Sequence, residues 1–128
     1  MKLIHAAAVW VCLAVTATLV AQNGVQRNVV QRMDSSVPGR EVLSVRVEFS
    51  AGASTGRHTH PGDEIDYVVD GEGEWLVEGQ ANRKAKAGDS IIIPGGTVHE
   101  ARNTGAAPLK VMAVFVVEKG KPLTTPAP

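Results

Sequence analysis

From residue 40 onward the chain is divided into short segments rich in valine and isoleucine, and glycine or proline bounds each of them. Turn signals such as Asp70-Gly71 separate the segments. Segments of this length and composition are typical of β-strands, and no stretch after residue 21 has a clear helical period. We therefore predict strands at residues 41–49, 65–69, 74–77, 90–93 and 109–118.

Many short strands joined by tight turns predict an all-β fold, a sandwich or barrel of antiparallel strands. A chain of 128 residues has room for one such domain. Lysine and arginine together number 13, as do aspartate and glutamate, and no basic cluster is present. A chain without a basic surface lacks the field that attracts phosphate backbones, so we expect no binding to nucleic acid.

The N-terminus has the layout of a secretory signal, with Lys2 followed by an almost wholly apolar run over residues 3–21. We predict a signal peptide over 1–21, cleaved after residue 21 or residue 17, and therefore a periplasmic or secreted protein with no stable membrane insertion. The alternative is an uncleaved segment that tethers the domain to a membrane. The single cysteine, Cys12, lies in this segment, so the mature domain has no disulfide and no thiolate metal site.

The remaining chain divides into three parts. Residues 22–39 are polar with short apolar interruptions and are interpreted as an N-terminal arm or edge strand. Residues 40–118 hold the predicted strands. Residues 119–128 contain three prolines and are interpreted as an extended C-terminal tail, either a solvated end or an arm lying across a neighbouring subunit.

Three histidines, His58, His60 and His99, lie in the strand region. Residues two apart in a strand point to the same side, so His58 and His60 project onto one face. Glu64 follows the next turn, close enough to add a carboxylate. Three neutral imidazole nitrogens and one carboxylate oxygen suit a divalent first-row metal ion better than calcium or magnesium. Histidines at this spacing also occur as surface or core hydrogen-bonding residues, so the pattern alone leaves metal binding open.

Two sets of residues at characteristic spacings frame these side chains. The first set is Gly52, His58, His60, Glu64 and Gly71. The second set is Gly88, Pro94, Gly96, His99 and Asn103. Together they resemble the two sequence motifs of the cupin family, complete and in the family's order, and the strand pattern extends the resemblance over residues 40–118.

The resemblance implies a double-stranded β-helix, a jelly-roll barrel, with one divalent metal ion held by His58, His60, Glu64 and His99. Manganese, iron, zinc, nickel and copper all fit such a set, and four protein ligands in an octahedron leave two positions open. The resemblance implies a small-molecule substrate or ligand. It admits a dioxygenase-like oxidoreductase, a metal-dependent lyase or isomerase, and a non-catalytic metal- or ligand-binding module.

Asp66 is a further candidate for a catalytic residue. If Glu64 points at the metal, strand alternation places Asp66 and Val68 on the same inward face. An inward aspartate there could orient a ligand histidine or act as a general base. The alternative is a local bulge that turns Asp66 to solvent.

The expected sheets have open edges, and an unpaired edge strand outside the cell is an aggregation hazard. We therefore predict a homodimer that covers such an edge.

Overall fold

The computed structural model describes residues 24–128, so the predicted signal peptide and its cleavage site lie outside the described residues. The described chain forms strands with these bounds: β1 (Val25–Asp34), β2 (Arg40–Phe49), β3 (His58–Thr59), β4 (Gly62–Asp70), β5 (Glu72–Val77), β6 (Arg83–Lys86), β7 (Ser90–Ile93), β8 (His99–Arg102), β9 (Leu109–Glu118) and β10 (Thr125–Pro126). No helix within residues 24–128 is long and apolar enough to cross a membrane.

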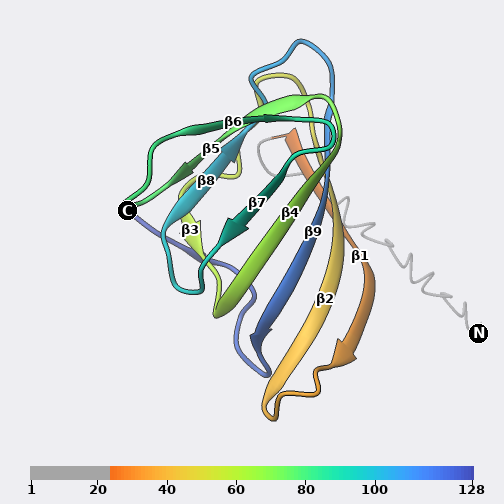
Figure 1. The fold of residues 1–128 in the computed structure, drawn as a ribbon, viewed down its shortest axis with the longest axis vertical. Helices are drawn as coiled ribbons and strands as arrows, with labels where there is room; N and C mark the ends of the chain where they lie inside the picture. The colour runs from red at the N-terminus through yellow and green to blue at the C-terminus, as the bar shows by residue number, and fades with distance from the viewer. Residues whose placement is uncertain (1–23) are drawn as a thin grey trace, which may run out of the picture.

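The strands form two five-stranded sheets. Figure 1 shows β1, β2, β9, β4 and β7 of the first sheet side by side. The first sheet has the order β1-β2-β9-β4-β7, and the second has the order β10-β3-β8-β5-β6. Every pairing between these strands is antiparallel. Within the described chain, only the connections β1–β2 and β5–β6 stay in one sheet, and every other connection passes from one sheet to the other. This architecture confirms the all-β prediction.

The core lies between the two sheets because strand alternation sends every second apolar side chain inward. In β9 the buried residues are Leu109, Val111, Ala113, Phe115 and Val117. In β2 they are Leu43, Val45, Val47 and Phe49. Trp75 of β5 is fully buried from the second sheet. Since β2 and β9 pair over ten residues in regular register, the first sheet gives the core a continuous apolar wall.

The predicted strands 90–93 and 109–118 coincide with β7 and β9. The sequence interpretation missed β6 and β8 because both are short and polar. Ala85 is the one buried residue of β6, and the buried positions of β8 are His99 and Ala101. Strands of this kind lack the alternation of large apolar residues on which the prediction relied.

Both ends of the described chain join the sheets. β1 is an edge strand, and nine of its ten residues are exposed. The C-terminal tail was expected to be solvated or to reach a neighbouring subunit. In the structure Thr125 and Pro126 instead pair with Thr59 and His58 of the chain's own β3.

Candidate metal centre

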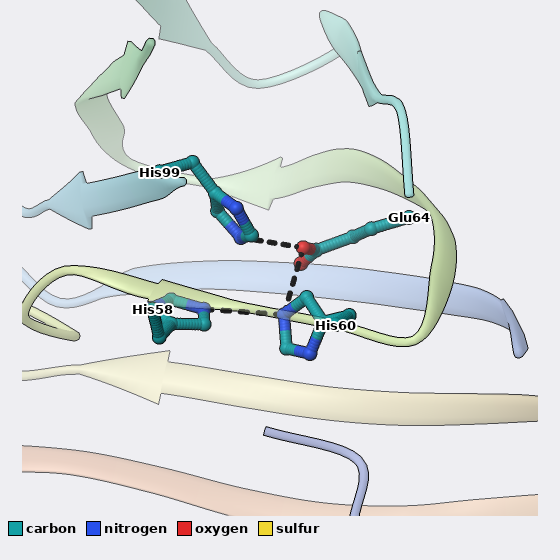
Figure 2. A group of neighbouring side chains, drawn as sticks. All are labelled: His58, His60, Glu64 and His99. Atoms are coloured by element: carbon teal, nitrogen blue, oxygen red, sulfur yellow. Dashed lines mark hydrogen bonds and ion pairs between the residues drawn. The ribbon is translucent and has the colours of Figure 1, made fainter. Parts of the chain in front are cut away.

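Four side chains predicted as metal ligands meet inside the barrel, as Figure 2 shows. His58 lies on β3, His60 in the turn that follows it, Glu64 on β4 and His99 on β8. His58 and His99 are directly opposite each other across two paired strands. All four residues are buried, and one ligand atom from each lies within 4.8 Å of the others. The structure therefore brings together the whole set from sequence positions up to 41 residues apart, from 58 to 99.

Two glycines allow the ligand-bearing segments to approach each other. A Cβ atom at Gly62 would overlap the backbone of Val116 on β9, and a Cβ at Gly95 would lie 2.9 Å from the backbone of Gly62. The adjacent Gly96 donates its backbone N–H to the carbonyl oxygen of His60 at 3.0 Å. These close backbone contacts hold the turn between His60 and Glu64 against the loop that leads to His99.

Each imidazole is oriented by a backbone carbonyl. The Nδ1 atom of His58 lies 2.8 Å from the carbonyl oxygen of Gly56, and that of His99 lies 2.9 Å from Thr97. The Nδ1 atom of His60 lies 2.6 Å from the carbonyl oxygen of Leu123, in the C-terminal tail. A carbonyl oxygen only accepts, so each Nδ1 carries the proton. In the neutral side chains every Nε2 then presents a lone pair.

These lone pairs converge on one another. The Nε2 atoms of His58 and His60 are 3.1 Å apart. The Oε2 atom of Glu64 lies 3.1 Å from His60 Nε2 and 2.9 Å from His99 Nε2. Within residues 24–128, Glu64 Oε2 and His99 Nε2 are buried and have no hydrogen-bond partner outside the cluster. Electron-rich atoms at such distances repel unless a cation lies among them, so the donor set fits a metal ion.

The pKa values of residues in the cluster also indicate a site that attracts a cation. Burial, with repulsion from His99 and His60, lowers the pKa of His58 to about 4, so His58 is neutral at pH 7. Burial raises the pKa of Glu64, but hydrogen bonds with His60 and His99 outweigh it and lower that pKa overall. Burial lowers the pKa of His99, but the Glu64 carboxylate raises it overall. The anionic carboxylate therefore draws either a proton or a metal ion to the imidazoles.

Asp66 points into the barrel from β4. It is 4% exposed, and the indole Nε1–H of Trp75 donates to its Oδ2 at 2.7 Å. Its other oxygen, Oδ1, is buried and has no hydrogen-bond partner. Burial, with the nearby charge of Glu64, raises the pKa of Asp66 well above its usual range. The irregularity of β4 falls between Val68 and Asp70, so no bulge turns Asp66 to solvent.

The cluster and Asp66 line a cavity of about 40 Å³. This is room for roughly a few water-sized groups, so a ligand held inside it must be small. Phe115 and Val111 give the cavity apolar walls. Arg27 of β1 and Leu123 of the tail also line it. The sequence interpretation assigned neither of them to the site, because their segments carried no motif and only the folded chain places them there.

Comparisons with known proteins agree with this architecture. The family model described as "Cupin domain" matches residues 45–115. A solved protein with a double-stranded β-helix domain from Klebsiella pneumoniae subsp. pneumoniae is similar with a TM-score of 0.66 and 25% identity, covering 81% of this chain and 87% of that one. The predicted double-stranded β-helix is thereby confirmed.

Two curated relatives are similar over the central part of the chain. The acireductone dioxygenase of Rhodopseudomonas palustris is 40% identical over 58 residues, which are 43% of this chain and 35% of the relative. The dimethylsulfoniopropionate lyase DddQ of Ruegeria pomeroyi is 38% identical over 56 residues, 44% of this chain and 28% of the relative. The chain thus spans little more than a third, at most, of either relative's length.

Proposed function

This chain belongs to the cupin domain family, and we propose that His58, His60, Glu64 and His99 bind one divalent metal ion that serves reactions of a small molecule. The observation that carries the proposal is the convergence of three imidazole Nε2 lone pairs and one carboxylate oxygen in a buried cluster. Each imidazole is fixed through its Nδ1–H, as is usual for histidines that ligate metals. Such a site suits manganese, iron, zinc, nickel or copper.

The first candidate activity is that of a dioxygenase-like oxidoreductase. A redox-active metal in the cluster would supply the oxygen chemistry, and the protein would bind and orient the substrate and exclude water. The similarity to an acireductone dioxygenase supports this candidate. The apolar walls around Phe115 suit a site from which bulk water is kept away.

The second candidate activity is that of a metal-dependent lyase or isomerase, and Asp66 favours it. Within residues 24–128 its Oδ1 has no hydrogen-bond partner, and Asp66 lines the cavity, where its carboxyl could accept or donate a substrate proton. The Trp75 indole holds the other oxygen, which fixes the orientation of the carboxyl. The similarity to a dimethylsulfoniopropionate lyase supports this candidate. In this reaction Asp66 is the proposed catalytic residue.

Elemental analysis of residues 22–128, purified without a histidine tag or chelator, tests the metal proposal. We expect close to one metal ion per chain. His99→Ala removes one imidazole and should lower the metal affinity about tenfold or more. Glu100→Gln is the matched control, because Glu100 is the neighbouring residue on β8 and its side chain contacts Ser54 and Arg102 instead of the cluster. Unchanged metal content in His99→Ala would contradict the proposal.

The identity of the metal and the need for oxygen separate the candidate activities. Manganese, iron, copper or nickel together with oxygen consumption would support the oxidoreductase. Stoichiometric zinc with turnover in the absence of oxygen would support the lyase or isomerase. A metal-loaded protein that turns over no small molecule in either assay would leave the non-catalytic binding module as the function.

A further inference from the structure

Arg27 of β1 faces the cavity that holds the histidine cluster. It lies opposite Val47 of β2, whose side chain is buried between the sheets and lines the same cavity. Residues opposite each other in paired strands share a face, so Arg27 is on the inner face of the first sheet. Arg27 is nevertheless among the exposed residues. A side chain that both lines a cavity and remains open to water stands at the cavity's opening.

The guanidinium of Arg27 has no anionic partner within residues 24–128. It takes part in none of the ion pairs or side-chain hydrogen bonds of that part of the chain. Arg32, further along β1, contrasts with it, because its Nε lies 3.8 Å from the Glu41 carboxylate. Burial lowers the pKa of Arg27 while the charge of Glu64 acts in the opposite direction. An arginine stays cationic in such a setting, so the residues that line the cavity include an unpaired cation that interacts with the charge of Glu64.

The charges lining the cavity favour an anion. The groups involved are the guanidinium of Arg27, the carboxylate of Glu64, the carboxyl of Asp66 and the imidazoles. With a divalent ion on the cluster, the sum is positive whether Asp66 is ionised or protonated. A neutral ligand would leave this charge uncompensated in a small cavity with apolar walls, where such a charge is costly.

We propose that Arg27 is the anchor for the carboxylate group of a small organic acid, whose opposite end reaches the metal cluster. The planar fork of a guanidinium matches the two oxygens of a carboxylate. The cavity of about 40 Å³ limits the acid to a few heavy atoms inside it. The inference rests on the proposed metal function and adds to it the class of ligand and a residue that selects that class.

Titration calorimetry on the manganese-loaded protein, residues 22–128, tests the proposal with malonate and acetate as probes. Their neutral amides, malonamide and acetamide, and inorganic phosphate serve as comparison ligands. The variants are Arg27→Met, which removes the charge, and Arg27→Lys, which keeps the charge without the fork. Arg32→Met is the matched control, because it removes an arginine of the same strand that is already paired with Glu41.

We expect a carboxylate to bind the wild type more tightly than its amide and than phosphate. Arg27→Met should weaken carboxylate binding roughly ten- to a hundredfold, the usual cost of losing hydrogen bonds to a charged group. The carboxylate affinity of Arg27→Lys should lie between those of the wild type and Arg27→Met. The carboxylate affinity of Arg32→Met should equal that of the wild type. All variants should retain the wild-type manganese affinity in a competition with a chelator, because Arg27 is not a ligand.

Equal carboxylate affinity in Arg27→Met and the wild type would overturn the inference. So would amides or phosphate that bind as well as carboxylates, or a wild type that binds no carboxylate. A wild-type protein that takes up none of manganese, iron, zinc, nickel and copper would contradict the proposed metal function separately. The titrations are then run on the metal-free protein, where the ratio of wild-type to Arg27→Met affinity still decides the role of Arg27.

Discussion

The three imidazoles of the cluster owe their orientation to carbonyl oxygens of the backbone. Gly56 and Thr97 each lie two residues before the histidine they orient, so the loop that leads into each strand supplies the carbonyl oxygen. Leu123 lies 63 residues from His60 and reaches it only through the folded tail. All three contacts place the proton on Nδ1 and leave Nε2 free for a metal. This orientation of the imidazoles suits ligation of a metal ion through Nε2.

Asp66 gives a prediction at the scale of one residue. Its pKa in the folded protein is raised above the ordinary value of 3.8, because burial and Glu64 disfavour the charged form. The stability that this carboxyl contributes is fully present below about pH 3.8, and it is lost as the pH rises through the folded-state pKa. Asn at this position cannot ionise and keeps an oxygen to accept from Trp75. We expect Asp66→Asn to raise the free energy of unfolding of the metal-free protein at pH 7, because the variant avoids the cost of ionising a buried carboxyl.

Urea unfolding of metal-free wild type and Asp66→Asn between pH 4 and pH 8 measures this effect. The difference between the two proteins should grow with pH. Asp70→Asn is the control, since Asp70 is exposed on the same strand and its side chain accepts only from the local N–H of Gly71. An Asp66→Asn variant that is less stable than the wild type at pH 7 would contradict the prediction. It would mean that the folded protein stabilises the ionised carboxylate of Asp66.

At the scale of elements, the C-terminal tail completes the wall of the site. β10 pairs with β3, and the backbone N–H of Ala127 donates to the carbonyl oxygen of Arg57 at 3.0 Å. These bonds hold Leu123 over the cavity, where its carbonyl accepts from His60 and its side chain packs against the core. The tail, which the sequence suggested to be a solvated end or an arm across a neighbouring subunit, thus contributes Leu123 and Thr124 to the cavity of the candidate metal centre.

Deletion of residues 123–128 should therefore weaken metal binding while the barrel remains folded. His60 would lose the acceptor that fixes its ring, and loss of such a partner usually costs about 10- to 100-fold in metal affinity. Competition with a chelator measures the affinity, and circular dichroism checks the fold. Leu123→Ala is the matched control, because it keeps the backbone carbonyl and should retain most of the affinity. Wild-type affinity in the deletion variant would rule out a role of the tail in orienting His60.

The short strands also show which strands the pattern of apolar residues can predict and which it cannot. The pattern was sufficient for β9 and β7, whose valines and isoleucines are bounded by turn residues. It was insufficient for β8, whose inward positions hold a histidine and an alanine. β8 is a strand because β3 and β5 pair with it on either side, and these pairings join segments distant in sequence. A strand that is stabilised mainly by pairing with neighbouring strands need not contain the residues typical of strands, so its own sequence does not predict it.

At the scale of the whole molecule, four of the seven large apolar residues that are exposed within residues 24–128 lie on or beside one edge strand. Val29, Val30 and Met33 of β1, with Val37 in the turn after it, are each between 50% and 60% exposed. β1 has no neighbour on its outer side within residues 24–128. An unpaired edge with apolar side chains is suited to a second copy of the same strand, because a twofold axis pairs each copy with the other. We therefore expect a homodimer formed through β1.

Light scattering after gel filtration at micromolar concentration should give the mass of two chains for residues 22–128. Val30→Lys should shift the protein toward the monomer by placing a charge on this edge. Ile92→Lys is the control, because Ile92 is 65% exposed on β7 at the opposite edge of the same sheet. A monomeric wild type would contradict the dimer, and dissociation by Ile92→Lys alone would assign the interface to the other edge.

The sequence by itself determined the all-β class, the positions of the apolar strands and the spacing that selects His58, His60, Glu64 and His99. It also predicted that Asp66 shares the inward face with Glu64, because alternation along a strand is a local property of the backbone, and the structure excluded the alternative of a bulge at Asp66. Only the tertiary structure decided that Leu123 orients His60 and that Arg27 stands at the opening of the cavity. Those placements depend on how β1 and the tail fold onto the barrel, and contacts between segments far apart in the chain leave no periodic pattern in either one.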